Sequence, residues 1–105
     1  MTTPNQLIAA LARHVGKGNG ISAEDLAKRL DMKPRALRQL ITEAIETENV
    51  AICGTPRDGY YIAANGQELI ETIEFHDQRA KHELGKAGRL RRMLGELFGQ
   101  THLPT

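Results

Sequence analysis

Hydrophobic residues repeat at helical spacing near the start of the chain. Intervals of three and four place side chains on one face of a helix, and the residues that show them are Leu7, Ile8, Leu11, Ala12 and Val15. Thr3 and Pro4 come just before, and these residue types are favoured as the N-cap and the first residue of a helix. We therefore expect a helix from Pro4 that ends at the glycine-rich loop 16–20.

A second helical pattern covers residues 21–42, ISAEDLAKRLDMKPRALRQLIT. Ser22 is suited to cap a helix over residues 23–30, and Pro34 to begin a second helix that ends near residue 47. The pattern predicts two short helices joined by a tight turn. The side chains expected in the interior of this pair are Leu26, Ala27, Leu30, Met32, Leu37 and Leu40.

Two β-prone runs follow, at residues 50–53 and 60–63, with the turn-rich segment 54–59 between them. Runs of this kind, separated by a short polar loop, are typical of a β-hairpin. Ile21 is expected to form a strand of one or two residues. Alternate residues of a strand share a face, so the side chains expected to close over the helices are Val50, Ile52, Tyr60 and Ile62.

The sequence after Asn65 and Gly66 is helical again, to about Phe98. A narrow seam along it is expected of a helix that lies on a domain or on a partner helix. Glycine lowers helix propensity, so we expect a break near Gly85. The residues of the seam are Leu69, Ile73, His76, Ala80, Leu84, Ala87, Leu90, Leu94 and Leu97.

These elements together predict a mainly α fold with a small β-hairpin. We expect one globular domain over residues 4–64, followed by a helical extension over residues 65–99. A chain of 105 residues has the length of a single domain with an appended arm.

The composition is that of an ordinary globular protein, with 40% hydrophobic and 26% charged residues. The 14 Lys and Arg residues nearly balance the 13 Asp and Glu residues, so any basic surface must come from local segregation. No apolar run approaches the length of a membrane span, and the N-terminus lacks the features of a secretion signal. We therefore expect a cytoplasmic protein with no membrane partner.

The helix over residues 34–47 carries polar side chains suited to nucleic acid. Arginine pairs with guanine edges and glutamine with adenine edges in the major groove, while lysine and a helix N-terminus hold phosphate. The side chains opposite its apolar face are Lys33, Arg35, Arg38, Gln39 and Thr42. The same set also fits the solvated face of an amphipathic helix. Acidic residues that would repel DNA limit any contact to the first turns, and these are Glu43, Glu46 and Glu48.

The order helix, loop, helix-turn-helix, hairpin resembles a winged-helix domain. The segment Ile52-Cys53 to Gly59–Ala63, followed by a helix that contains Arg79-Ala80, is similar to small phage- and prophage-encoded winged helix-turn-helix DNA-binding proteins. The resemblance spans roughly residues 5–84. It departs from the family at Asp31, which stands at a turn position where such proteins often have glycine.

The resemblance implies that the helix over residues 34–47 is the recognition helix and that residues 55–59 are the tip of the wing. It gives Arg57 a place on the DNA backbone or in the minor groove, beside Asp58. The DNA-binding residues expected from the residues and the resemblance together are Ser22, Lys33, Pro34, Arg35, Arg38, Gln39, Thr42, Thr55 and Arg57.

No catalytic or metal-binding motif stands out, so we expect neither an enzyme nor a cofactor. The glycine-rich loop 16–20 lacks the spacing of a nucleotide-binding loop. Cys53 is the only cysteine, so an internal disulfide is excluded. The sequence places no catalytic base near it, and we expect it to be a half-buried packing residue. The four histidines show no ligand spacing, and His76 on the seam is expected to be packed or hydrogen-bonded and not a metal ligand.

Residues 79–92 contain six basic residues and one acid. Positive charge complements the C-terminal half of a helix dipole, which is one explanation. The segment could also contact phosphate without sequence preference. The same helix could instead pair with its copy in a homodimer.

We expect a sequence-specific regulator that binds double-stranded DNA in the cytoplasm of a bacterial host. It would be phage-derived and act in transcription, or in phage DNA replication or transposition. Two alternatives remain: a protein-interaction adaptor that uses the same fold without DNA, and a structural phage component.

Overall fold

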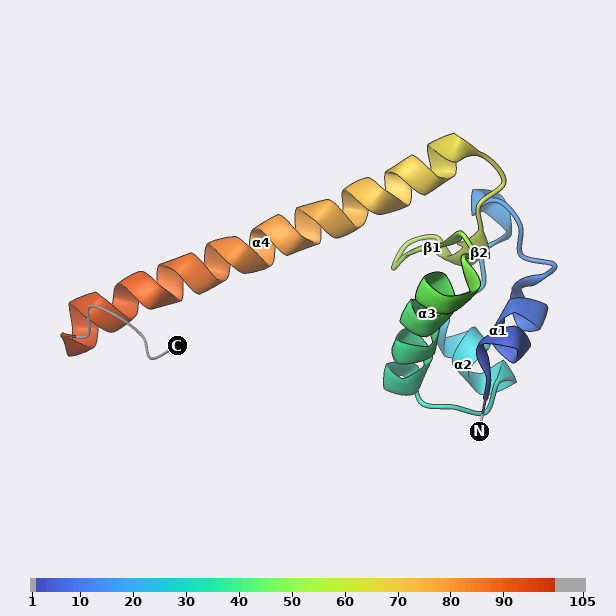
Figure 1. Cartoon of the computed structure of the whole chain (residues 1–105), viewed down its shortest axis with the longest axis horizontal. Coiled ribbons are helices and arrows are strands. Elements are labelled where there is room, and N and C mark those ends of the chain that lie inside the picture. Colours follow the sequence, from blue (N-terminus) through green and yellow to red (C-terminus); the bar gives the residue numbers. More distant parts are fainter. Residues whose placement is uncertain (1, 100–105) are drawn as a thin grey trace. The chain divides into compact units, whose positions relative to one another are not determined.

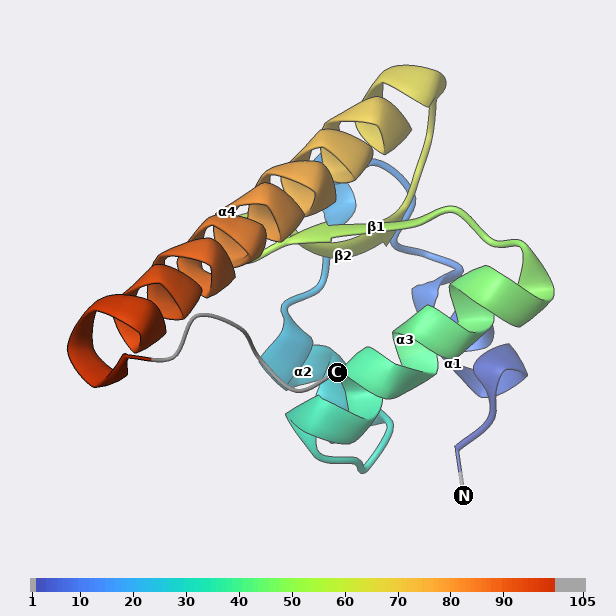
Figure 2. The same cartoon turned by 60° about the vertical axis from the view of Figure 1, so that its left-hand side comes forward.

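The computed structural model describes residues 2–99 and is mainly helical, with one two-stranded antiparallel sheet in the described part. This confirms the predicted class. The elements in chain order are α1 (Pro4–Leu11), the 3-10 turn η1 (Lys17–Asn19), α2 (Ala23–Arg29), α3 (Pro34–Glu48), β1 (Ile52–Thr55), β2 (Gly59–Ile62) and α4 (Gly66–Phe98). Figures 1 and 2 show α1, α2 and α3 grouped together, with the hairpin beside them.

Helix α1 begins where the sequence predicted, because its first turn is capped from both sides. The Thr3 side chain accepts a hydrogen bond from the Gln6 N–H at 3.3 Å, and the Gln6 side chain accepts one from the Thr3 N–H at 2.8 Å. The helix ends at Leu11. Val15, which was expected on its buried stripe, lies outside the helix and is 43% exposed.

The backbone groups that follow α1 form hydrogen bonds with the hairpin instead of continuing the helix. The N–H of Ile62 donates to the carbonyl of His14 at 2.7 Å, and the N–H of Gly16 donates to the carbonyl of Ile62 at 2.9 Å. These bonds form an isolated parallel bridge between Val15 and Ile62. The long-range pairing therefore decides where α1 stops.

The turn between α2 and α3 has the hydrogen bonds of a Schellman motif. The N–H of Met32 donates to the carbonyl of Ala27 at 2.9 Å, and the N–H of Asp31 donates to that of Lys28 at 3.1 Å. Asp31 adopts the left-handed conformation that this motif requires, with φ of 52°. The aspartate thus fills the position expected of it in the tight turn.

The main core lies where α1, α2 and α3 meet one face of the hairpin. Leu30 and Met32 were expected inside but are only half-buried at its edge. The buried residues of the core are Leu7, Leu11, Ile21, Leu26, Ala27, Leu37, Leu40, Ile41, Ala44 and Ile52.

Strands β1 and β2 pair antiparallel in the order Ile52 with Ile62 and Thr55 with Gly59. The predicted runs were displaced by up to two residues, and the turn between the strands shortens to residues 56–58. Ile21 pairs with Tyr60 through two backbone hydrogen bonds of 2.9 and 2.7 Å, which confirms its predicted short strand.

Gly59 allows the chain before α2 to approach the hairpin. Its φ of 74° is unfavourable for other residues, and a Cβ here would lie 2.5 Å from the carbonyl oxygen of Ile21. A side chain at Gly59 would therefore disrupt the pairing of Ile21 with the hairpin.

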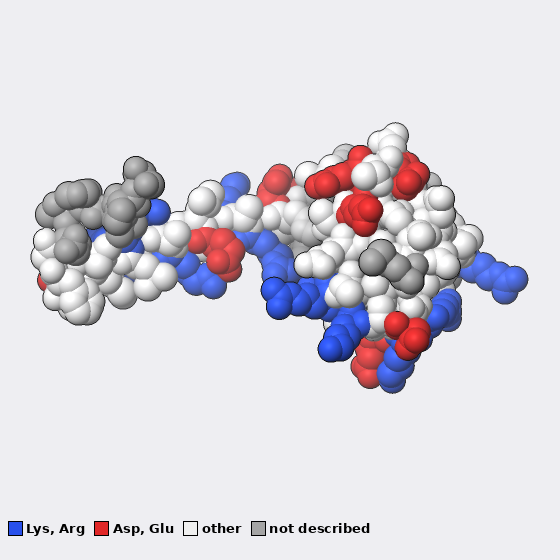
Figure 3. Space-filling view, turned by 60° about the horizontal axis from the view of Figure 1, so that its bottom comes forward, with Lys and Arg blue, Asp and Glu red and all other residues white. Residues whose placement is uncertain are grey.

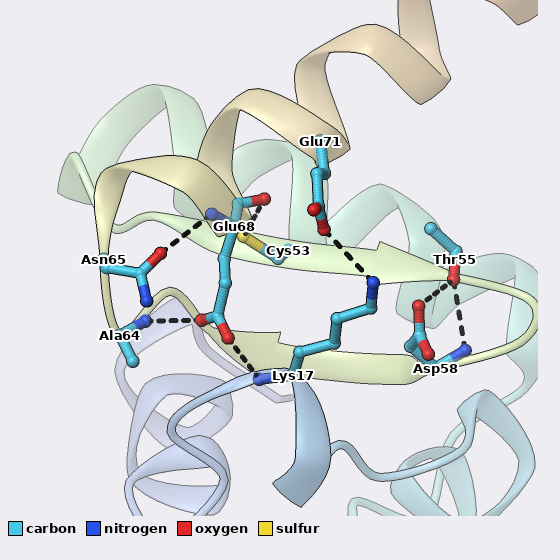
Figure 4. Close-up of polar contacts among 8 residues, drawn as sticks. All are labelled: Lys17, Cys53, Thr55, Asp58, Ala64, Asn65, Glu68 and Glu71. Atoms are coloured by element: carbon cyan, nitrogen blue, oxygen red, sulfur yellow. Dashed lines mark hydrogen bonds and ion pairs between the residues drawn. The ribbon is translucent and has the colours of Figure 1, made fainter.

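The second face of the hairpin is also buried, because the start of α4 packs beside it. Cys53 and Tyr61, which share this face, are 0% and 1% exposed. The Cys53 thiol lies 3.8 Å from the carbonyl oxygen of Glu68, as Figure 4 shows. Cys53 is therefore fully buried, and the expectation of a half-buried cysteine is wrong.

The first two turns of α4 thus lie within the N-terminal unit, which extends to Ile73. A second unit, the helical unit, begins at Glu74 and continues α4 to Phe98. The expected break near Gly85 is absent, because α4 continues through it without interruption. His76 is exposed, and its ring lies edge-on to that of Phe75, with 5.7 Å between the ring centroids. Among the described helices, none combines the length and apolar character needed to cross a membrane.

Candidate nucleic-acid interface

The first half of α3 presents a row of exposed polar side chains. Its apolar residues Leu37, Leu40, Ile41 and Ala44 are buried in the core, so the helix places its other side in solvent. Four residues of that side line one open hollow of about 380 Å³, and they are Arg35, Arg38, Gln39 and Thr42. The structure therefore brings these predicted site residues together.

The basic groups of this row are available to a ligand. Three ion pairs are present in residues 2–99, and none of them involves Lys33, Arg35 or Arg38. Thr42 donates its hydroxyl proton to the Arg38 carbonyl at 3.1 Å, so its oxygen can still accept a hydrogen bond and its methyl group is free.

Lys33 and Pro34 lie at the N-terminus of α3 and are exposed. Lys33 is the N-cap residue in an extended conformation, and its side chain makes no capping hydrogen bond. The positive end of the helix dipole and the first N–H groups therefore lie next to the row of polar side chains.

The second half of α3 has the opposite charge. Glu43, Glu46 and Glu48 are exposed, as is Asn49 in a left-handed conformation at the C-terminus of the helix. Figure 3 shows one acidic group at the top of the N-terminal unit, and basic side chains along its lower part with further acidic ones among them. Charge is therefore partly segregated on this face, although the net value is only +1.

Ser22 lies apart from this row in the chain and already has a structural role. Its hydroxyl oxygen accepts a hydrogen bond from the Asp25 N–H at 3.1 Å and so caps α2. Its hydroxyl proton remains available as a donor.

The tip of the hairpin contains Thr55 and Arg57. The Thr55 hydroxyl donates to the Asp58 carboxylate at 3.0 Å and accepts from the Asp58 N–H at 3.1 Å, which holds the turn. Arg57 is exposed at the centre of the turn. Of these two predicted residues, Arg57 is free for a ligand and Thr55 is engaged within the turn.

Glu68 positions the hairpin relative to α4, and the sequence reasoning did not identify it. Its carboxylate accepts hydrogen bonds from the N–H groups of Lys17 and Ala64, both at 2.8 Å (Figure 4). The Asn65 side chain accepts from the Glu68 N–H at 3.0 Å. An Asn followed three residues later by Glu is a capping pattern, and this was the available signal.

The described residues contain no group of three or more His, Cys, Asp or Glu side chains that could hold a metal ion. No protein-family model, no curated protein and no solved structure matches this chain.

Proposed function

We propose that the N-terminal unit is a winged helix-turn-helix domain that binds double-stranded DNA in a sequence-specific manner. In this proposal α2 and α3 form the helix-turn-helix, and the hairpin is the wing. The observation that supports it most directly is the row of exposed side chains at Arg35, Arg38 and Gln39, whose basic members have no acidic partner in the described chain.

These side chains have the chemistry to read base edges. Arginine donates two hydrogen bonds to the O6 and N7 atoms of guanine, and glutamine pairs in the same way with adenine. The methyl group of Thr42 suits contact with a thymine methyl. Because these side chains occupy only the first half of α3, they can read only a few neighbouring base pairs. The acidic residues after Thr42 keep the rest of α3 away from phosphate.

Contacts to the DNA backbone would come from the N-terminus of α3 and from the hairpin. Lys33 and the uncapped N-terminus of α3 suit one phosphate. Arg57 at the tip of the hairpin suits another, or the minor groove. Such contacts fix the position of the protein but carry no sequence information.

The regulator would act by occupying its site, in transcription or in phage DNA replication or transposition. The phage origin rests on the resemblance of the sequence to small phage-encoded proteins of this class. The cytoplasm of the bacterial host is the compartment that this function requires.

The second candidate is a protein-interaction adaptor with the same fold. The observation that favours it is the acidic second half of α3, where Glu43 and Glu46 are exposed beside the polar row. In that case the row and the acidic residues beside it would together bind a partner protein.

A salt titration separates the two candidates. Fragments of the genome that encodes the protein would be captured by binding to it and sequenced. Binding to the selected site would then be measured by fluorescence anisotropy from low to high salt. DNA binding through several phosphates releases counterions, so the affinity should fall steeply as salt rises. Failure to retain any fragment at low salt would support the adaptor.

Alanine substitutions then test the recognition helix. Arg35→Ala and Arg38→Ala should each weaken binding to the selected site by about 1–3 kcal/mol for a lost base contact. Arg13→Ala is the matched control, since it removes the same charge from an exposed residue in the turn after α1. A double variant that binds the selected site as tightly as the parent would refute the assignment of α3.

A further inference from the structure

The helical unit has large apolar side chains in solvent, on one side of the helix and at the edge of that side. Leu84, Leu90 and Leu97 are 73%, 64% and 69% exposed. Large apolar side chains that lie in solvent along a helix mark a surface for another helix.

The stripe follows a seven-residue repeat. From Ile73 onward, residues at alternating intervals of three and four share one side of the helix, and they are Ile73, His76, Ala80, Glu83, Ala87, Leu90, Leu94 and Leu97. Glu83 is the charged member of this set, and it already forms an ion pair of 3.0 Å with Lys86. A repeat of this length is typical of helices that pack along one another.

Charges flank the repeat unevenly. Asp77 and Leu84 lie beside this repeat on one edge, followed by Arg91, while Arg79 and Lys86 lie beside it on the other edge. In a parallel pair of such helices, opposite edges meet, and Lys86 of one copy would face Arg91 of the other. That arrangement places like charges together at both sides of the seam.

In an antiparallel pair, the same edges meet. If Ile73 packs against Leu97 of a second copy, the repeat also places Ala80 against Leu90, a small residue against a large one, His76 against Leu94, and Glu83 against Ala87. Asp77 then lies beside Arg91 of the second copy, twice by symmetry, and Leu84 lies beside its own counterpart near the two-fold axis. One like-charge contact, Lys86 with its counterpart, remains.

We propose that the helical unit pairs with the same unit of a second copy in the antiparallel direction. The occupant of the exposed stripe is thus another molecule of this chain, and charge complementarity sets its direction. The pairing uses no residue of the α3 row. Its test needs no DNA, so its failure would leave the proposed DNA binding untouched.

Disulfide trapping tests the direction. Leu84→Cys should form a disulfide-linked dimer under mild oxidation, because the two positions meet near the symmetry axis. Leu90→Cys is the matched control, since it faces Ala80 in the antiparallel pair but its own counterpart in a parallel one. The parent chain controls for the buried Cys53. Cross-linking of Leu90→Cys in preference to Leu84→Cys would overturn the proposal.

A charge exchange tests the contact itself. Asp77→Arg should raise the dissociation constant of the dimer roughly tenfold at low salt, because two attractive contacts become repulsive. Adding Arg91→Asp to the same chain should restore it, whereas Arg89→Asp on the outer side should not. Analytical ultracentrifugation gives the constants. A parent that stays monomeric at the highest soluble concentration, or a double variant that is not restored, would refute the antiparallel pair.

Discussion

The carboxylate of Glu68 accepts a hydrogen bond from the backbone N–H of Lys17, 51 residues earlier in the chain, at 2.8 Å. The Lys17 side chain also forms an ion pair with Glu71 at 3.2 Å. These contacts join the loop after α1 to the first turns of α4 beside the hairpin (Figure 4). They hold the start of α4 over the face that contains Cys53.

Replacing Glu68 by glutamine should destabilise the N-terminal unit. The carboxylate accepts from Ala64 with one oxygen and from Lys17 with the other, and a glutamine amide has a single oxygen to accept with. Glu68→Gln should therefore unfold at lower urea concentration than the parent at pH 7. Glu74→Gln, which alters an exposed residue of the same helix, is the control and should unfold like the parent.

The effect of Glu68→Gln should depend on pH. Hydrogen bonds from Ala64 and then Lys17 hold the pKa of the Glu68 carboxyl below its ordinary value of 4.5. Above that value the stabilisation is complete, and it is lost as pH falls through 4.5 towards the lowered pKa of the folded state. The difference between parent and variant should thus shrink between pH 7 and pH 3. An equal difference at both values would contradict this explanation.

Substituting Asp31 should reveal the cost of its backbone conformation. Its φ of 52° is unfavourable for residues with a Cβ, and glycine is the common residue at this place in the motif. Asp31→Gly should raise the free energy of unfolding by about 0.5–1 kcal/mol, whereas Asp31→Ala should bring no gain. Urea denaturation of both variants is the measurement. An alanine variant as stable as the glycine variant would contradict the explanation from backbone conformation.

Leu37 anchors α3 in the core and should be costly to remove. It is 0% exposed, so Leu37→Ala should lower the free energy of unfolding by about 2–5 kcal/mol through lost burial and the cavity left behind. Ile45, on the same helix, is 44% exposed, and Ile45→Ala should cost less than about 1 kcal/mol. Similar losses for the two variants would contradict the observed packing of α3.

Cys53 should be unreactive in the folded protein. Its side chain is 0% exposed, and burial raises the pKa of its thiol above the ordinary value of 9.0. A disulfide reagent such as DTNB should label it slowly at pH 8 and completely in concentrated urea. Rapid labelling without urea would show that the first turns of α4 leave the hairpin readily.

The helices could be predicted because their signals are local. Thr3 with Pro4, Ser22 and Pro34 mark three helix starts, and all three lie where the structure has them. The turn at Asp31 was predictable for the same reason, since its motif involves only neighbouring residues. The end of α1 was not, because the bonds that stop it come from Ile62.

The polar row of α3 could also be predicted, since the helical repeat separates Arg35 and Arg38 from the buried Leu37. The sequence pattern did not show whether each polar group already has a hydrogen-bond partner within the protein. Thr55 looked equivalent to Arg57 as a site residue, yet its hydroxyl is engaged within the turn. Such engagement depends on the distance between atoms and cannot be inferred from residue type.

By itself, therefore, the amino-acid sequence determined the helix starts, the hairpin, the polar side of α3 and the repeat along α4. Each follows from spacing or from caps within a few residues. The tertiary structure alone decided that both faces of the hairpin are covered, that Cys53 is fully buried and that Glu68 bonds to Lys17. These depend on backbone N–H and carbonyl groups that must find partners far along the chain once water is excluded.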